Sequence, residues 1–367
     1  MTSPVRLFVS AGERSGDLRG GAMVSALKDH VPNLHLRGLG GEHLAGCGLI
    51  SEVALDKLAV MGFAEVIRLI PFFFRLLGRL TRIFRTWQPD RVLLVDYPGL
   101  NLRLARKAKR MGIPVTYYVS PQVWAWGSGR ILTIRDTVDQ MLVLFDFEKT
   151  LYDEAGVDAV HVGHPLVDEV APTMTAHSFR REVRLDDRPL LALLPGSRPQ
   201  EVRRHLPVMI RAAAMVEGVS PVVGLAPGID PAGIPAPVPW THRVYDLLAC
   251  ADAAVVASGT ATLEAALLGT PLVVVYRTHA LNALLARRIL TIPYVAMANV
   301  VAGRQIVPEC LQGEFTPPRV AAEVTRILRN DAVRQQMRRD LKDVARRLGP
   351  PGASMRAAQV LASRLRP

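Results

Sequence analysis

The feature that most constrains the fold is a short apolar run followed by a small polar turn and an alanine- and leucine-rich segment. Its clearest instance joins Ala253–Val256 through Ser258-Gly259-Thr260 to Ala265–Leu268. Such a sequence predicts a strand, a tight turn and a helix. Other apolar runs that end in a polar or glycine-containing turn occupy residues 5–10, 91–95 and 190–194. Repetition of this unit predicts doubly wound α/β domains built on parallel sheets.

The turn at Ser258-Gly259-Thr260 is a candidate phosphate site. Gly259 lets a ligand approach the backbone, Ser258 and Thr260 carry hydroxyls, and the first N–H groups of the following helix have no partners within it. The helix dipole favours an anion there. Glu264 follows about one turn later, within reach of a sugar diol that such a phosphate carries. The alternative for this stretch alone is an ordinary capped helix.

Three further turns follow predicted strands. The loop Gly12–Asp17 lacks both the third glycine of a dinucleotide fingerprint and the GK[ST] of a P-loop, so it is either a ligand loop of another kind or a tight turn. Asp96 stands at a strand end, where a general base belongs, although a helix-capping aspartate also fits. Ser197 and Arg198 can offer a hydroxyl and a guanidinium to a phosphate.

The segment 62–86 mixes bulky apolar residues with arginines. Phe72, Phe73 and Phe74 point about 100° apart on a helix, so one core face cannot hold all three. An exposed aromatic patch beside arginines predicts a membrane interface or an acyl-chain groove. A core helix with arginines that reach solvent is the alternative. The candidate contact residues are Phe72, Phe73, Phe74, Arg75, Leu76 and Arg79.

Composition narrows the class of partner. The 367-residue chain has a net charge of +12, which favours phosphorylated ligands or an anionic lipid surface. Nucleic acid is disfavoured because no reading motif or aromatic stacking platform is present. Three distant cysteines and two histidines without a third ligand, His161 and His164, predict no disulfide framework and no metal site. No secretory signal or spanning segment is apparent, so we expect a cytoplasmic protein, unless it lies on a membrane surface.

Eight stretches together resemble one family, the lipid-A-disaccharide synthases, which are GT-B glycosyltransferases. They occur in the family's order, from the N-terminus to about residue 312. The stretches are Ser10–Asp17, Val60–Gly62, Asp96–Pro98, Ser120–Trp126, Gly163–Pro165, Leu193–Arg198, Ser258–Glu264 and Asn299–Arg304. The chain departs from the family's pattern in the proline-rich segment Pro227–Pro239 and in the weakly basic stretch Gly127–Arg130.

The resemblance implies two Rossmann-like doubly wound domains that face each other across a cleft. Residues 1–170 would form the acceptor- and membrane-facing domain, 171–345 the UDP-sugar domain, and 346–367 a helix that returns to the first domain. The implied reaction joins UDP-2,3-diacylglucosamine to 2,3-diacylglucosamine 1-phosphate (lipid X) with inversion, without a metal or other cofactor. It would belong to lipopolysaccharide synthesis in a Gram-negative bacterium, on the cytoplasmic, anionic surface of the inner membrane.

The resemblance also implies roles for individual residues. Asp96 would be the catalytic base, with Glu13 as the rival candidate. The acceptor side would include Gly12, Ser15 and Gly16. The donor side would be formed by Ser197, Arg198, Ser258, Gly259, Thr260, Glu264 and Asn299.

Two rival functions stay open from the residues. One is another UDP-sugar enzyme of the same architecture, either a polyprenyl-linked glycosyltransferase or a UDP-sugar 2-epimerase. The other is a non-catalytic, basic peripheral membrane protein that only binds phospholipid. An epimerase needs no second acyl sugar, and a binding protein releases no UDP.

Overall fold

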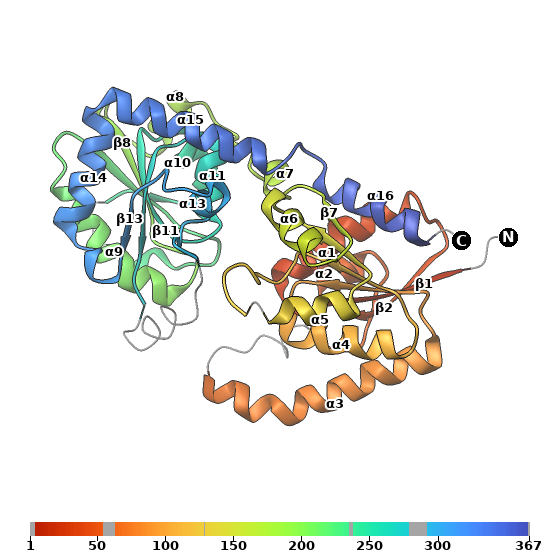
Figure 1. Ribbon diagram of the computed structural model, residues 1–367. Helices are drawn as coiled ribbons and strands as arrows, with labels where there is room; N and C mark the ends of the chain where they lie inside the picture. Colours follow the sequence, from red (N-terminus) through yellow and green to blue (C-terminus); the bar gives the residue numbers. More distant parts are fainter. Residues whose placement is uncertain (1–3, 54–62, 128, 235–237, 279–291, 366–367) are drawn as a thin grey trace. The chain divides into compact units, whose positions relative to one another are not determined.

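The computed structural model describes residues 4–53, 63–127, 129–234, 238–278 and 292–365. The chain divides into two compact units. Unit 1 comprises residues 1–165 and 349–367, and unit 2 comprises residues 166–348. Each unit is a parallel sheet with helices packed on it (Figure 1).

Unit 1 is a parallel sheet with strand order β3-β2-β1-β4-β5-β6-β7. Its strands are β1 (Val5–Ala11), β2 (Leu34–Leu39), β3 (Ile50–Ser51), β4 (Arg91–Val95), β5 (Val115–Tyr118), β6 (Gln140–Val143) and β7 (Ala159–His161). Its helices are α1 (Arg14–Lys28), α2 (Glu42–Gly46), α3 (Phe63–Trp87), α4 (Pro98–Arg110), α5 (Arg130–Thr137), α6 (Asp146–Glu154) and α16 (Ala353–Leu365). The strand order reverses at β1, which lies between β2 and β4, so the loops after β1 and β4 diverge at this point. Ligands of such sheets bind there.

Unit 2 repeats the plan with strand order β10-β9-β8-β11-β12-β13. Its strands are β8 (Leu190–Leu194), β9 (Ser220–Gly224), β10 (Trp240–Thr241), β11 (Ala253–Ala257), β12 (Leu272–Tyr276) and β13 (Glu309–Leu311). Its helices are α7 (Leu166–Glu169), α8 (Ala176–Glu182), α9 (Pro199–Ala214), α10 (Val244–Cys250), α11 (Ala261–Leu268), α13 (Met297–Ala302), α14 (Pro317–Arg329) and α15 (Asp331–Arg347), with 3₁₀ turns at Pro231–Gly233 and Gln312–Glu314. The order reverses at β8, between β9 and β11. The loops after β8 and β11 therefore leave adjacent strand ends.

The strands of both sheets are nearly continuous apolar runs because helices cover them. All five residues of β4, β8 and β11 are buried. This pattern is typical of parallel sheets covered on both faces. It explains why the short apolar runs in the sequence identified these strands.

The C-terminal helix belongs to unit 1. Helix α16 packs against α1, the Arg356 Nε atom donates to the Val162 carbonyl at 2.9 Å, and Arg364 pairs with Asp158 at 2.6 Å. The sequence predicts domain boundaries after residues 170 and 345, and the structural units divide the chain after residues 165 and 348.

Helix α3 packs one face on the core of unit 1 and leaves another exposed. Leu76 is only 3% exposed and joins the core cluster, so the prediction that it contacts acyl chains is wrong. Phe72 and Phe73 are half-buried against the same core, whereas Phe74 is 66% exposed. The helix begins at Phe63, eight residues before Pro71, and the side chains before Pro71 lie outside the described residues.

Two observations concern contact with a membrane. Arg75 is exposed, and the largely exposed Arg79 pairs with Glu52 at 3.1 Å. Within the described ranges, no helix combines the length and apolarity that crossing a bilayer requires.

Candidate functional site

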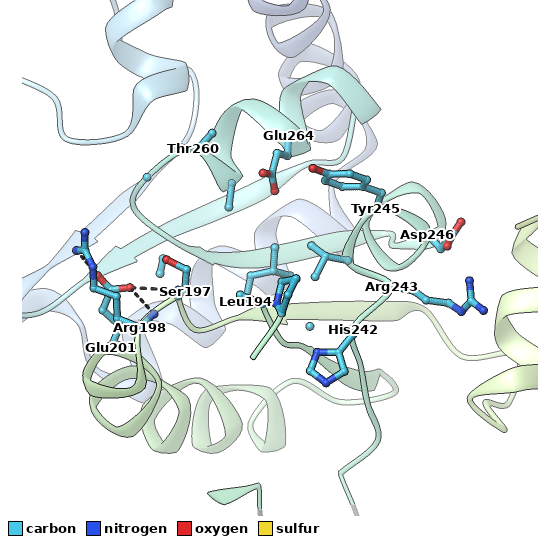
Figure 2. A pocket seen from close by; sticks show the side chains of 18 of the residues that line it. Leu194, Ser197, Arg198, Glu201, His242, Arg243, Tyr245, Asp246, Thr260 and Glu264 are labelled. Atoms are coloured by element: carbon cyan, nitrogen blue, oxygen red, sulfur yellow. Dashed lines mark hydrogen bonds and ion pairs between the residues drawn. The ribbon is translucent and has the colours of Figure 1, made fainter. Parts of the chain in front are cut away.

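A pocket of about 640 Å³ lies at the carboxyl ends of β8 and β11 in unit 2 (Figure 2). Six of the seven residues predicted for the donor line it: Ser197, Arg198, Ser258, Gly259, Thr260 and Glu264. They come from two loops about 60 residues apart in sequence, which the adjacent strands β8 and β11 bring together. The pocket combines the start of a helix with two arginines and three carboxylates, and this combination suits a phosphorylated ligand with hydroxyl groups.

The start of α11 presents backbone N–H groups to this pocket. No described residue accepts a hydrogen bond from the N–H groups of Gly259, Thr260 or Ala261. Gly259 has φ +149°, a conformation that residues with a side chain rarely adopt. The Ser258 hydroxyl donates to the Val295 carbonyl at 2.8 Å, so it positions the turn. The groups left for an anion are therefore mainly backbone N–H groups.

The loop after β8 is held by Glu201, which the sequence analysis missed. Its Oε2 atom accepts from the N–H groups of Ser197 at 3.2 Å and Arg198 at 3.4 Å (Figure 2). Its Oε1 atom lies 3.4 Å from Arg198 Nη1, and the Arg198 side chain is 69% exposed. A glutamate three residues after a helix cap is the signal that could have found it. Arg198 is thus held loosely and is accessible to a ligand.

Glu264 is a partly buried carboxylate that lines the pocket. Burial and the nearby Glu169 raise the pKa of Glu264 to about 7. Tyr245 lies beside it in the pocket (Figure 2), and burial together with Glu264 raises the pKa of the Tyr245 phenol to about 12. A carboxylate in this position readily accepts hydrogen bonds from hydroxyl groups.

His242, Arg243 and Tyr245 line the pocket although the sequence analysis did not select them. They lie between the two-residue strand β10 and the first turn of α10. Neither a glycine turn nor a long apolar run marks this stretch, so periodicity alone could not place it at the sheet's edge. Assigning these three residues to the pocket required the order of the strands in the sheet.

Asn299 does not line this pocket. Its side chain is fully buried, and its amide nitrogen donates to the Val307 carbonyl at 3.0 Å and to Glu309 at 2.8 Å. Its amide oxygen accepts from the N–H groups of Ile306 and Val307. The structure does not support the predicted nucleotide contact, because these protein partners occupy both polar atoms.

In unit 1, Asp96 and Glu13 follow the adjacent strands β4 and β1, whose last residues, Ala11 and Val95, are register partners. Asp96 is half-buried, and burial raises the pKa of its carboxyl group. The Tyr97 N–H donates to Asp96 Oδ1 at 2.8 Å. Glu13 is exposed. Of the two candidate bases, Asp96 has the environment that makes a carboxylate more basic.

The backbone at Asp96 is strained. Asp96 and Tyr97 have φ +49° and +48°, both in the left-handed region. Each such residue with a side chain costs about 1–2 kcal/mol. Two strained residues at a sheet's carboxyl edge are typical of a functional site, where surrounding contacts hold an unusual geometry.

Two of the three predicted acceptor residues serve packing. A Cβ atom on Gly12 would lie 2.2 Å from the Tyr97 ring, and Gly16 is buried in α1 beside the Val95 carbonyl. Their contact with an acceptor stays a prediction. Ser15 is exposed in the first turn of α1, and its acceptor contact stays a prediction. Among the described residues, no group of three or more His, Cys, Asp and Glu side chains is arranged to hold a metal ion.

Solved structures of low sequence identity share this architecture. The calicheamicin glycosyltransferase CalG4 has a TM-score of 0.62 at 17% identity, covering 100% of this chain and 99% of that chain. The UDP-GlcNAc 2-epimerase from Neisseria meningitidis, solved with UDP-GlcNAc bound, has a TM-score of 0.59 at 12% identity, covering 99% of each chain. These similarities establish the GT-B fold, but they do not distinguish a transferase from an epimerase.

Sequence relatives make that distinction. The profile of the family described as lipid-A-disaccharide synthetase matches residues 7–226 and 239–363, which leaves out most of the proline-rich segment. The chain is 44% identical to the lipid-A-disaccharide synthase of Myxococcus xanthus (strain DK1622), covering 100% of this chain and 99% of the relative. It is 43% identical to that of Syntrophus aciditrophicus (strain SB), covering 98% and 97%. The chain therefore belongs to the lipid-A-disaccharide synthase family, the glycosyltransferases of lipid A biosynthesis.

Proposed function

We propose that this protein transfers 2,3-diacylglucosamine from UDP to the 6-hydroxyl of 2,3-diacylglucosamine 1-phosphate, releasing UDP. The observation that carries the proposal is the unit 2 pocket. It brings the N–H groups of α11, Arg198 and Glu264 together at one sheet edge, as a nucleoside diphosphate requires. Family membership supplies the acyl-sugar substrates.

In the proposed reaction, the acceptor O6 attacks the anomeric carbon, and the bond from that carbon to the diphosphate breaks. Asp96 takes the proton from O6, and inversion at the anomeric carbon gives the β-1,6 linkage. The raised pKa of Asp96 supports this role, because a more basic carboxylate is a better proton acceptor.

The leaving UDP gains negative charge as the bond breaks. The N–H groups at the start of α11 and the guanidinium of Arg198 would stabilise that charge. Glu264 would bind the ribose hydroxyls. With these groups in place, we expect turnover without a divalent cation.

The test is UDP release from UDP-2,3-diacylglucosamine in detergent and EDTA, with and without 2,3-diacylglucosamine 1-phosphate. We expect release that depends on the acceptor and is unaffected by EDTA. Conversion of the UDP-sugar alone would instead indicate an epimerase. Absence of UDP release under every lipid condition would contradict the proposal and favour a lipid-binding protein.

The pH dependence of donor binding tests the role of Glu264. Ribose hydroxyls donate to the ionised carboxylate, and its pKa of about 7 in the empty pocket means that binding below this pH must first expel a proton. Affinity for UDP-N-acetylglucosamine, whose phosphates do not titrate in this range, should be constant above pH 7 and fall about tenfold per unit well below it. Calorimetry in two buffers should detect the released proton at pH 6.

Glu264→Gln is the matched variant for this measurement. It should bind more weakly at pH 8 and lose the pH dependence, because the amide does not titrate. A pH dependence that persists unchanged in Glu264→Gln would assign the titration to another group and overturn the role of Glu264.

We further propose that α3 places unit 1 on an anionic membrane surface. The exposed Phe74 and the neighbouring Arg75 combine an apolar ring with a cation, which suits the boundary between acyl chains and headgroups. Acylated substrates require access to that boundary.

The double substitution Phe74→Ser and Arg75→Glu should weaken binding to phosphatidylglycerol-containing vesicles by roughly tenfold or more. Burying a phenylalanine is worth about 1.5–3 kcal/mol, and each surface cation adds about 1 kcal/mol. Vesicle co-sedimentation measures the effect. Met215→Ser, at another exposed apolar side chain, in unit 2 (54% exposed), is the control and should bind as the unaltered protein does. Equal binding by both variants would exclude α3 as the contact.

A further inference from the structure

A buried side-chain amide connects the ends of β1 and β4. Asn101, on α4, is fully buried, and its Nδ2 atom lies 2.7 Å from the Asp96 carbonyl oxygen. The same atom lies 3.2 Å from the carbonyl oxygens of Ser10 and Val95. The Asn101 Oδ1 atom accepts a hydrogen bond from the Ser10 hydroxyl at 2.7 Å. Both polar atoms of Asn101 therefore have partners inside the protein.

A second buried donor reaches the Asp96 carbonyl from the neighbouring strand. The hydroxyl of Tyr117, on β5, donates to the Asp96 carbonyl oxygen at 2.5 Å. Tyr117 is fully buried, and burial raises the pKa of its phenol well above the ordinary value, so the group stays protonated and remains a donor. Two donors from different elements thus share one carbonyl oxygen.

The peptide that carries this carbonyl also holds the Asp96 carboxylate, because its N–H, from Tyr97, donates to Asp96 Oδ1 at 2.8 Å. Asp96 and Tyr97 both occupy the left-handed region, which disfavours residues with a side chain. The ring of Tyr97 packs over Gly12, where any side chain would collide with it. Without the two donors, this peptide would be free to rotate toward a conformation that relaxes Tyr97, and its N–H would no longer hold Asp96 Oδ1 in place.

We infer that Asn101 and Tyr117 are positioning residues for the reaction, which hold Asp96 in the strained geometry that presents its carboxylate to the acceptor hydroxyl. This inference rests on the proposed role of Asp96 as the base. Both side chains are fully buried, so their loss should lower kcat and leave the KM for both substrates nearly unchanged.

The test is Tyr117→Phe, which removes one hydroxyl and keeps the ring. We expect kcat to fall roughly tenfold to a hundredfold, the range that a small misplacement of a reacting group produces. Thr116→Val is the matched control on the adjacent residue of β5. It also removes a fully buried hydroxyl, one that accepts from Arg91 Nη1 at 3.0 Å and lies away from Asp96. Thr116→Val should lower the melting temperature yet retain the kcat of the unaltered protein.

The outcomes separate this inference from the proposed function. If Asp96→Asn is inactive while Tyr117→Phe keeps full kcat, the base assignment stands and the positioning role is overturned. If Thr116→Val loses as much kcat as Tyr117→Phe, the effect is one of general stability, which also overturns it. Asn101→Ala provides a second variant, expected to lose at least as much kcat. If it does not fold, the comparison of Tyr117→Phe with Thr116→Val decides alone.

Discussion

Asp96→Asn is expected to lower kcat by about 10²–10⁴ while leaving UDP binding intact, because the amide keeps the shape of the carboxylate but cannot accept the proton of the acceptor hydroxyl. Asp96 lies in unit 1, outside the set of residues that line the unit 2 pocket. Steady-state UDP release gives kcat, and calorimetry with UDP gives the affinity. We expect the two effects to separate because Asp96 and the pocket residues belong to different units.

Two variants control for the loss of a carboxylate elsewhere in unit 1. Glu13→Gln changes the rival base, which is exposed at the start of α1, and should retain more activity than Asp96→Asn. Asp139→Asn changes a carboxylate that pairs with Lys109 at 2.6 Å and should leave kcat unaltered. If Asp96→Asn turned over normally and Glu13→Gln did not, the base assignment would have to be reversed.

Arg198→Ala should lower kcat by about 10²–10³, because it removes a cation at the point where the leaving diphosphate gains charge. The substitution is well suited to this test. Glu201 holds the loop by accepting hydrogen bonds from the backbone N–H groups of Ser197 and Arg198, which Arg198→Ala keeps, and the Arg198 side chain is 69% exposed. Acceptor-dependent UDP release measures the change in kcat, and thermal melting should show nearly unchanged stability.

Arg211→Ala is the matched control, on the helix α9 that Arg198 caps. Its guanidinium is exposed and donates to the Pro207 carbonyl of its own helix, so its removal should not affect UDP release. Arg198→Lys keeps the charge but loses the fork of donors, and it should fall between the two. Full activity in Arg198→Ala would show that the N–H groups of α11 suffice to stabilise the leaving diphosphate, and it would overturn the role of Arg198.

The fold could be predicted from the sequence because parallel strands covered by helices are short, apolar and followed by turns. The runs at 91–95 and 253–257 are buried at every residue, so periodicity and composition identified them. Helix α3 shows the limit of this approach. Three consecutive phenylalanines predicted exposure, yet Phe72 and Phe73 pack against the core and only Phe74 projects freely.

The site could be predicted in part. A glycine turn before a helix carries its own chemical signal, so the 258–260 turn and Glu264 were found. Asn299 was selected from its resemblance to a motif, and the structure shows its amide satisfied by Glu309 and by the backbone near Val307. Tyr245 was missed, because its stretch carries no such signal.

The sequence by itself determined the strand–turn–helix units, the polar residues at their turns and, through its motifs, the family. Only the tertiary structure decided which turns meet, which glycines make room for a neighbour and which polar groups already have partners. The physical reason is that propensity and periodicity act over a few residues along the chain. The neighbours of Asp96 and Glu264 come instead from other elements of the fold, Tyr117 on β5 for Asp96, and Glu169 on α7 with Tyr245 on α10 for Glu264. The hydrogen bonds of Tyr117 and Asn101 to the Asp96 carbonyl exist only once β4, β5 and α4 are packed.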